Sequence, residues 1–282
     1  MVLERGLSYD QLPEWQRERS SSNIRSHYRS GGSYTECIKS LFWFHQIHNE
    51  FWNAWTMIIT NIIGAILISN TLMEYYPVMS DIDRFIFILF WIHGMVHLPF
   101  SVGNHLFDCI NPEIAEKWHQ YDFKMICISA DILTFILSFY VFPIWFTCIL
   151  TMIGIFATYK VFDIIQHVHR DRAESTGYVG IHVLLYALPV IYQSMVELFN
   201  DNNKESGAFY CFLGMAISLS IGAFTFAYEF PQRYSKSGRF DRFLNGHNIM
   251  HFGVAGAYLS EFTFLCHMTL SARKESNIAL LY

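Results

Sequence analysis

Long runs of apolar residues separated by short polar segments dominate this 282-residue chain from residue 53 onward. A helix needs about 20 apolar residues to cross the hydrocarbon core of a bilayer, and seven runs are long enough. The pattern therefore predicts an all-α protein, a bundle of seven transmembrane helices. The predicted spans cover residues 53–73, 84–106, 122–142, 143–164, 178–199, 208–228 and 247–269.

The polar flanks of these runs divide the chain into three regions. Residues 1–40 are rich in Arg, Ser and Gly, and we expect a polar tail outside the bilayer, with an amphipathic segment from Cys37 to His48 leading into the membrane. Residues 41–270 are the predicted membrane domain, and residues 271–282 are a short tail. No signal-peptide pattern precedes the first span, which is therefore expected to direct insertion.

Lysine and arginine are unequally distributed between the two predicted sides. With a cytoplasmic N-terminus, only four of the nineteen, Arg84, Lys204, Arg273 and Lys274, lie on the opposite side. The positive-inside rule therefore predicts a cytoplasmic N-terminus and a C-terminus on the other side. The fifteen cytoplasmic cations are Arg5, Arg17, Arg19, Arg25, Arg29, Lys39, Lys117, Lys124, Lys160, Arg170, Arg172, Arg233, Lys236, Arg239 and Arg242.

Composition agrees with a membrane protein and excludes other classes. Hydrophobic residues make up 52% of the chain and charged residues 15%, against about a quarter charged in soluble domains. The net charge of −5 argues against nucleic acid as a partner. The six cysteines form no Cys-x-x-Cys pair, which argues against a thiolate metal site and a disulfide framework.

Four polar residues lie at the ends of three predicted spans. His105 ends the second span, Asp122 opens the third, and His247 and His251 open the seventh. With the N-terminus inside, all three ends face the cytoplasm. Residues four apart share one face of a helix, so His247 and His251 can point at the same ion. Three histidines with an open fourth position are typical of a catalytic zinc site, and the pattern predicts one here.

Two further residues have candidate roles at this site. Asp122 could bind zinc directly, hold its water, or orient that water as a base. Ser101 lies one turn deeper than His105 and could hydrogen-bond a ligand, a water or a substrate oxygen. A single histidine among the thirteen in this chain more often packs against its neighbours than binds metal. The pair His247 and His251 alone is also weak evidence for a metal site. The prediction rests on four residues from three spans at one depth.

Other polar residues lie deeper in the predicted spans. His93 and His97 precede Ser101 at four-residue intervals in the second span, while Asp131 and Glu261 lie in the third and seventh. Polar groups at such depth usually face an interior cavity or bond a neighbouring helix. A cavity lining and plain interhelical bonding are equally compatible with the pattern.

Several of these segments resemble the progestin and adipoQ receptor (PAQR) family. The resemblance covers roughly residues 34–265, and the chain departs from the family at Met57, where a histidine is usual, and at Asp131. The matching motifs are Cys37-Ile-Lys-Ser-Leu-Phe, Asn49-Glu50, Asn53-Ala-Trp55-Thr56, Ser101-Val-Gly-Asn-His105 followed by Asp122, Glu229-Phe-Pro231-Gln-Arg233 with Gly238, and His247-Asn-Ile-Met-His251.

The resemblance implies a seven-span fold with a cytoplasmic N-terminus. It implies zinc bound by His105, His247 and His251, with Asp122 and Ser101 beside the metal-bound water. The family includes receptors for adiponectin and progestins and is similar to haemolysin III-like proteins and alkaline ceramidases. A lipid or steroid ligand or a protein hormone is therefore an expected partner, besides membrane lipids. The segments 37–42 and 101–109 look closest to a Golgi-resident branch of the family.

These observations lead to two expectations and a less favoured third. The first is a multi-pass PAQR-type receptor, in the plasma membrane or Golgi/endomembrane, whose zinc-activated water hydrolyses a lipid amide such as ceramide. The second is a non-enzymatic scaffold or signalling regulator with structural zinc, whose N-terminal tail binds a cytosolic signalling protein. The third is a transporter or channel that uses the polar face of the second span.

Overall fold

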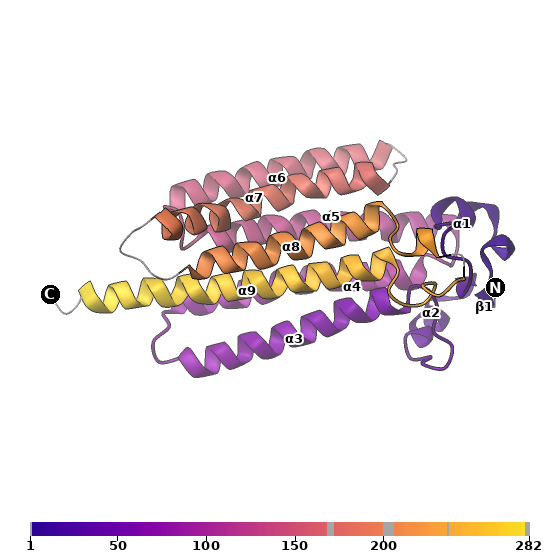
Figure 1. The fold of residues 1–282 in the computed structure, drawn as a ribbon, viewed down its shortest axis with the longest axis horizontal. Helices are drawn as coiled ribbons and strands as arrows, with labels where there is room; N and C mark the ends of the chain where they lie inside the picture. Colours follow the sequence, from indigo (N-terminus) through magenta and orange to yellow (C-terminus); the bar gives the residue numbers. More distant parts are fainter. Residues whose placement is uncertain (1, 168–171, 200–205, 236, 280–282) are drawn as a thin grey trace. The chain divides into compact units, whose positions relative to one another are not determined.

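Seven long helices account for the apolar runs of the chain in the computed structural model, which describes residues 2–167, 172–199, 206–235 and 237–279 (Figure 1). Each predicted span falls largely within one of these helices. Outside the described residues lie three of the counted cations, Arg170, Lys204 and Lys236, and the last three residues of the C-terminal tail. The helices are α3 (Phe51–Tyr75), α4 (Asp81–Phe107), α5 (Pro112–Ser138), α6 (Ile144–His167), α7 (Arg172–Phe199), α8 (Gly207–Ala227) and α9 (Gly246–Ala279).

Six of the seven helices are long and apolar enough to cross a membrane, among the residues that the structure describes. The qualifying segments are Phe51–Tyr75, Asp81–Phe107, Ile144–Asp163, Val179–Phe199, Gly207–Ala227 and Gly246–Ala272. The remaining long helix, α5, has 27 residues and so is about 40 Å long. It does not qualify as a span because Asp122, Lys124 and Asp131 interrupt its apolar part. The chain is thus an integral membrane protein built as a helical bundle.

Helix α5 begins ten residues before Asp122, whereas the apolar pattern suggested a start at Asp122 itself. The side chain of Asn111 accepts a hydrogen bond from the backbone N–H of Ile114 at 2.8 Å, and Pro112 occupies the first helical position. An asparagine cap followed by proline is a strong helix-start signal. Asp122 therefore lies inside a helix, three turns from its N-terminus.

The residues before α3 also contain short strands, which the all-α prediction did not include. Strands β1 (Glu4–Leu7) and β2 (Tyr28–Ser30) pair in antiparallel fashion, with Arg5 opposite Arg29. Between and after them lie a 3₁₀ turn (Tyr9–Gln11), α1 (Glu14–Arg19) and α2 (Tyr34–Ser40). Ser33 and Glu36 form a capping box that sets the start of α2.

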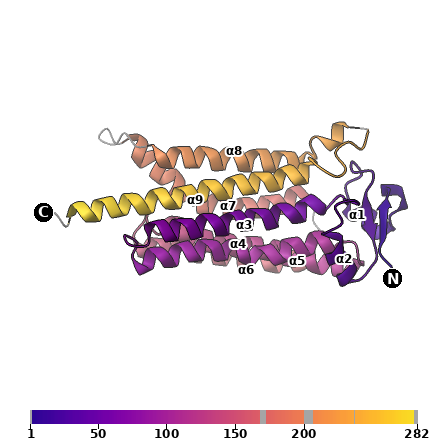
Figure 2. The same ribbon diagram turned by 90° about the horizontal axis from the view of Figure 1, so that it is seen from below.

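The described chain divides into two compact units, and the first contains the four candidate residues at the span ends. It comprises residues 1–60, 97–125 and 219–255: the N-terminal segments, the C-terminal end of α4, the start of α5, and the loop between α8 and α9 with its 3₁₀ turn at Gln232–Tyr234. Asn23 bonds Glu229, and Ser26 bonds Asp241 at 2.7 Å, so the N-terminal segments lie against that loop (Figure 2). One apolar cluster of this unit contains Leu3, Cys37, Leu41, Ala54, Leu106, Phe107 and Cys109.

The second unit comprises residues 61–96, 126–218 and those from 256 onward. Helices α6 and α7 lie side by side within it (Figure 1). A Cβ on Gly214 would lie 2.6 Å from the hydroxyl of Ser260, and one on Gly256 would lie 2.6 Å from that of Ser218. These two glycines let α8 and α9 approach closely, which is how small residues stabilise helix pairs inside membranes.

Candidate metal centre

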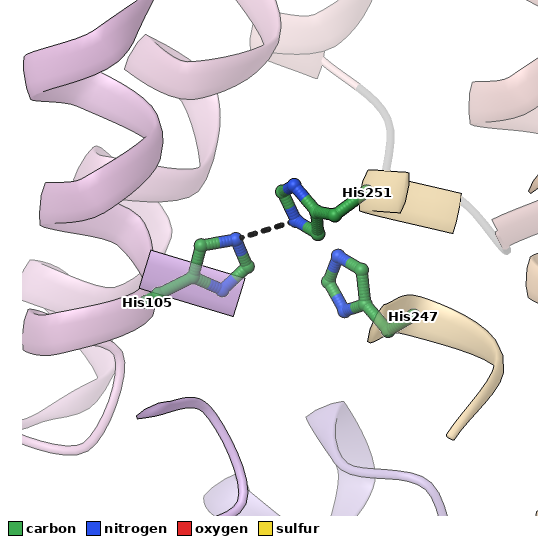
Figure 3. Close-up of side chains that lie close together, drawn as sticks. All are labelled: His105, His247 and His251. Atoms are coloured by element: carbon green, nitrogen blue, oxygen red, sulfur yellow. Dashed lines mark hydrogen bonds between the residues drawn. The ribbon is translucent and has the colours of Figure 1, made fainter. Parts of the chain in front are cut away.

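Three histidine side chains converge where the end of α4 meets the start of α9 (Figure 3). His105, His247 and His251 each offer one ring nitrogen, and these three atoms lie within 4.8 Å of one another. The Nε2 atoms of His105 and His251 are 3.1 Å apart. Among the described residues, this is the one group of three or more His, Cys, Asp or Glu side chains arranged to hold a metal ion.

The start of α9 positions two of these histidines. The side chain of Asn245 accepts hydrogen bonds from the backbone N–H groups of His247 and Asn248, at 3.1 and 3.0 Å. Such a cap fixes the first turn of a helix. A Cβ on Gly246 would lie 2.1 Å from the carbonyl oxygen of Thr225, so only glycine fits there. The cap and the close approach together set the rotation of α9 that turns His247 and His251 toward His105.

Two residues from the N-terminal half hold His105. Its Nδ1 lies 2.8 Å from a carboxylate oxygen of Glu50, the residue just before α3. Its backbone carbonyl accepts a hydrogen bond of 2.9 Å from the guanidinium of Arg29, which is buried and also donates to the hydroxyl of Ser40 at 2.6 Å. Because His105 lies in the last turn of α4, Arg29 also supplies a positive charge to a helix C-terminus.

A chain of amide groups extends this support to α9. The same Glu50 oxygen accepts a hydrogen bond of 2.7 Å from the side chain of Asn53. Asn53 in turn accepts one of 2.5 Å from the side chain of Asn248, which lies between the two α9 histidines. Both asparagines are almost completely buried. The orientations of His105 and of the first turn of α9 are therefore coupled through Glu50 and Asn53.

Glu50 is ionised in this arrangement. Burial by itself raises the pKa of its carboxyl, but the hydrogen bond and charge of His105, with the charge of His247, outweigh burial and bring the pKa below its ordinary value. This carboxylate keeps a proton on Nδ1, so that a neutral, metal-bound His105 would present its Nε2 lone pair to the ion. Carboxylate–histidine pairs of this kind orient metal ligands and raise their basicity.

The donor set and its spacing fit zinc. Two nitrogens bound to one tetrahedral zinc at about 2.0–2.1 Å lie roughly 3.3 Å apart, close to the 3.1 Å that separates the two Nε2 atoms here. The Nδ1 atom of His251 is buried without a hydrogen-bond partner, and its Nε2 atom is the one that faces His105. Three neutral imidazoles leave a fourth position open, which is the ligand set of catalytic zinc sites.

Asp122 is held beside the histidines rather than among them. One of its carboxylate oxygens lies 2.7 Å from Nε2 of His97, and the other accepts a hydrogen bond of 2.9 Å from the side chain of Asn104. Asn104 directly precedes His105 in α4. Close packing of α4 on α5 permits these contacts, because a Cβ on Gly103 would lie 2.1 Å from the ring of Trp118. His97 therefore gains a specific partner that the sequence pattern left undetermined.

Ser101 is buried in α4, one turn from both His97 and His105. The sequence pattern predicted no role for Glu50, Asn53 and Arg29, although all three contact the site or its support. Two of them, Glu50 and Asn53, stood in segments that carry the family resemblance. A polar Glu-x-x-Asn pair at the N-terminal end of the first predicted span is the signal that could have drawn attention to them.

Comparison with known proteins places the chain in a family. The family model described as haemolysin-III related matches residues 45–262. The chain is similar to the ADIPOR-like receptor IZH2 of Saccharomyces cerevisiae, with 24% identity over 275 residues that cover 95% of this chain and 83% of the yeast protein. It is also similar to the adiponectin receptor protein of Drosophila melanogaster, with 23% identity over 273 residues, 93% of this chain and 59% of the fly protein.

The family match spans α3 to α8 and the first half of α9, and it includes all three clustered histidines, Asp122 and Glu50. Both relatives align along nearly the whole of this chain, as the resemblance read from the motifs implied. A membrane-embedded helical bundle, a family match over residues 45–262 and two adiponectin-receptor relatives agree: this chain belongs to the haemolysin-III-related family, the family of the PAQR and adiponectin-receptor proteins.

Proposed function

We propose that this protein is a multi-pass PAQR-type receptor with a zinc centre at its cytoplasmic side, and that the centre hydrolyses a lipid amide such as ceramide. The observation that carries the proposal is the convergence of His105, His247 and His251, with Glu50 bonded to Nδ1 of His105. Packed histidines with no metal role do not need three ring nitrogens facing one point or a carboxylate that fixes one tautomer.

The residues around this point have separable roles. His105, His247 and His251 would hold zinc, which supplies Lewis acidity and an activated water when bound. Hydrogen bonds to His97 and Asn104 hold the carboxylate of Asp122 in place. Asp122 would accept the proton released during attack on the acyl carbon, and His97 would stabilise its charged form. Ser101 would donate a hydrogen bond to a substrate oxygen from one turn below His105. Membrane lipids reach the centre directly from the bilayer in this proposal.

We further propose seven spans with a cytoplasmic N-terminus, with α5 counted as the third span. The carboxylate of Asp131 accepts a hydrogen bond from Thr158, which lowers the cost of placing this residue in the membrane. With seven spans, the end of α4 and the start of α9 lie on the same side as the N-terminus. The contact of Arg29 with His105 agrees with that arrangement, and the excess of Lys and Arg makes this side cytoplasmic.

Elemental analysis of the detergent-purified protein is the first test. We expect about one zinc per chain in the wild type and its loss in His247→Ala/His251→Ala. Ceramide turnover in lipid nanodiscs then follows, with Asp122→Asn as the informative variant, because it should keep zinc and lose hydrolysis. A well-folded wild type without zinc, or turnover that persists in the double variant, would refute the mechanism.

A second function, a scaffold or signalling regulator with structural zinc, is favoured by one specific observation. Both oxygens of Asp122 already have hydrogen-bond partners, His97 and Asn104, which suits a structural acid as well as a base. Zinc would then staple α4 to α9, and a cytosolic signalling protein would bind the N-terminal segments. In this case Asp122→Asn keeps zinc, ceramide is not hydrolysed by the wild type, and removal of zinc lowers the melting temperature, because metal binding is coupled to folding.

A further inference from the structure

A second buried polar cluster lies in the other compact unit. Asp131 of α5, Thr158 of α6 and His182 of α7 bring three polar side chains together from three helices, and each is less than 8% exposed. Two of the helices, α6 and α7, contain segments apolar enough to span a membrane. Ionisable side chains in such an environment are costly and usually have a function.

The three side chains form an ordered hydrogen-bond chain. The hydroxyl oxygen of Thr158 lies 2.7 Å from Oδ2 of Asp131 and 2.9 Å from Nε2 of His182. A hydroxyl has only one proton to donate. When Thr158 donates to Asp131, His182 must donate its Nε2 proton to Thr158. When Thr158 instead donates to His182, Asp131 must carry a proton and donate it to Thr158. With an imidazolium in the first arrangement and a neutral imidazole in the second, both contain the same number of protons, and they differ in whether His182 or Asp131 carries the titratable one.

The second carboxylate oxygen of Asp131, Oδ1, takes no part in this hydrogen-bond chain. Oδ1 is buried without a hydrogen-bond partner and lies 3.9 Å from Nε2 of His182. A Cβ on Gly154 would lie 2.5 Å from this oxygen, so α6 has a glycine where the carboxylate needs room. A buried acceptor without a donor costs about 1–3 kcal/mol, unless the group takes up a proton or another donor.

The titratable groups that interact with Asp131 lie on two helices. Among the described residues, the titratable groups that interact with Asp131 are His182 on α7 and Cys127, one turn away on α5 itself. The contacts from α6 are Thr158 and Gly154, neither of which titrates. Asp131 and His182 are therefore an acid and a base that one hydroxyl connects.

We propose that Asp131, Thr158 and His182 form an intramembrane proton-binding site, in which a single proton is shared between the carboxylate and the imidazole through the threonine hydroxyl. In one direction, the Nε2–H bond of His182 breaks and the proton joins Oγ1 of Thr158, while the original hydroxyl proton of Thr158 joins Oδ2 of Asp131. An imidazolium and a carboxylate thus become a neutral imidazole and a carboxylic acid, with charge and protons conserved. The site does not depend on zinc.

Infrared difference spectroscopy of the full-length protein in lipid nanodiscs tests this proposal, with the proton itself as the probe. A protonated carboxyl group has a carbonyl stretching band outside the amide region, and the band shifts in D₂O. We expect a pH-dependent band in the wild type that Asp131→Asn removes. Thr158→Val and His182→Gln should each shift the pH midpoint of the band by about one unit or more, as removal of a hydrogen-bonded or charged partner does.

Two comparison variants separate this site from other effects. Thr151→Val removes a threonine of the same helix whose hydroxyl bonds only the carbonyl of Thr147, and it should leave the midpoint unchanged. Thr158→Ser retains the hydroxyl and should restore the wild-type midpoint. The proposal is wrong if Asp131→Asn removes no titrating band, or if Thr158→Val titrates like the wild type. Because His247→Ala/His251→Ala should keep the band, failure of the zinc proposal would leave this result unaffected.

Discussion

The carboxylate of Glu50 should set the affinity of the histidine centre for zinc, although Glu50 itself is not a proposed ligand. Its oxygen lies 2.8 Å from Nδ1 of His105 and 2.7 Å from the side-chain nitrogen of Asn53. Substitution by glutamine keeps the size of the side chain and removes its charge. The bond to His105 then changes from a charge-assisted to a neutral hydrogen bond, which is about half as strong.

The magnitude follows from that change. A hydrogen bond to a charged group contributes about 1.5–3 kcal/mol, against about 1 kcal/mol for a neutral one. The loss of about 1–2 kcal/mol corresponds to roughly a 5–30-fold weaker zinc affinity, within the range of about 10–100-fold found for carboxylates that support metal-binding histidines. Because Asn53 can still bond Glu50→Gln through the amide oxygen, the fold of the site should survive.

The assay is competition for zinc between the detergent-purified protein and a chromophoric chelator of known affinity at neutral pH. Glu116→Gln is a matched control, since Glu116 also accepts a hydrogen bond of 2.6 Å, from Arg19, but at the surface. Its zinc affinity should equal that of the wild type. Wild-type affinity in a folded Glu50→Gln variant would refute the role of Glu50, and an equal loss in Glu116→Gln would show that the effect is nonspecific.

Three further predictions concern stability. Arg29→Met should lower the melting temperature and weaken zinc binding, because it removes two buried hydrogen bonds from a charged guanidinium. One such bond alone contributes about 1.5–3 kcal/mol, so an unchanged melting temperature would contradict this prediction. Gly246→Ala should destabilise the protein by at least about 1–3 kcal/mol, because the added Cβ clashes with the carbonyl of Thr225. Gly180→Ala is the control in the same thermal unfolding experiment and should be neutral or slightly stabilising, because no atom lies within 4 Å of its added Cβ. Burial and the charge of Arg29 hold the pKa of His48 well below its ordinary value, so the unfolded chain binds this proton more readily. Stability should therefore fall as the pH drops below about 6.5, by at most about 1.4 kcal/mol per unit for this group, and His48→Gln should show a shallower dependence of melting temperature on pH.

The apolar pattern was enough to locate the long helices. A bilayer requires about 20 apolar residues per helical crossing and internal bonding of every backbone polar group, so the position of a span is a local property of the sequence. Each predicted span accordingly falls largely within one helix from α3 to α9. Helix α5 differs at its start because Asn111 and Pro112 act as a cap, a signal that is also local and could have been used.

The three histidines could be predicted as candidate metal ligands from the sequence for a related reason. His105, His247 and His251 lie at span ends that a seven-span topology brings to one side, so their depth follows from the order of the helices alone. Their distance from one another does not. The 3.1 Å between Nε2 of His105 and of His251 depends on the rotation of α4 and α9 about their axes, and Gly246 and the Asn245 cap position α9.

The tertiary structure alone revealed the support around these histidines. Glu50 and Arg29 are 55 and 76 residues from His105 in the chain, yet both bond it. It also directed Asp122 toward His97 and Asn104. Hydrophobic patterning reports which face of a helix is buried, but it contains no information on which polar atom meets which across helices. Those pairings are decided by side-chain packing and by the need of each buried polar group for a partner.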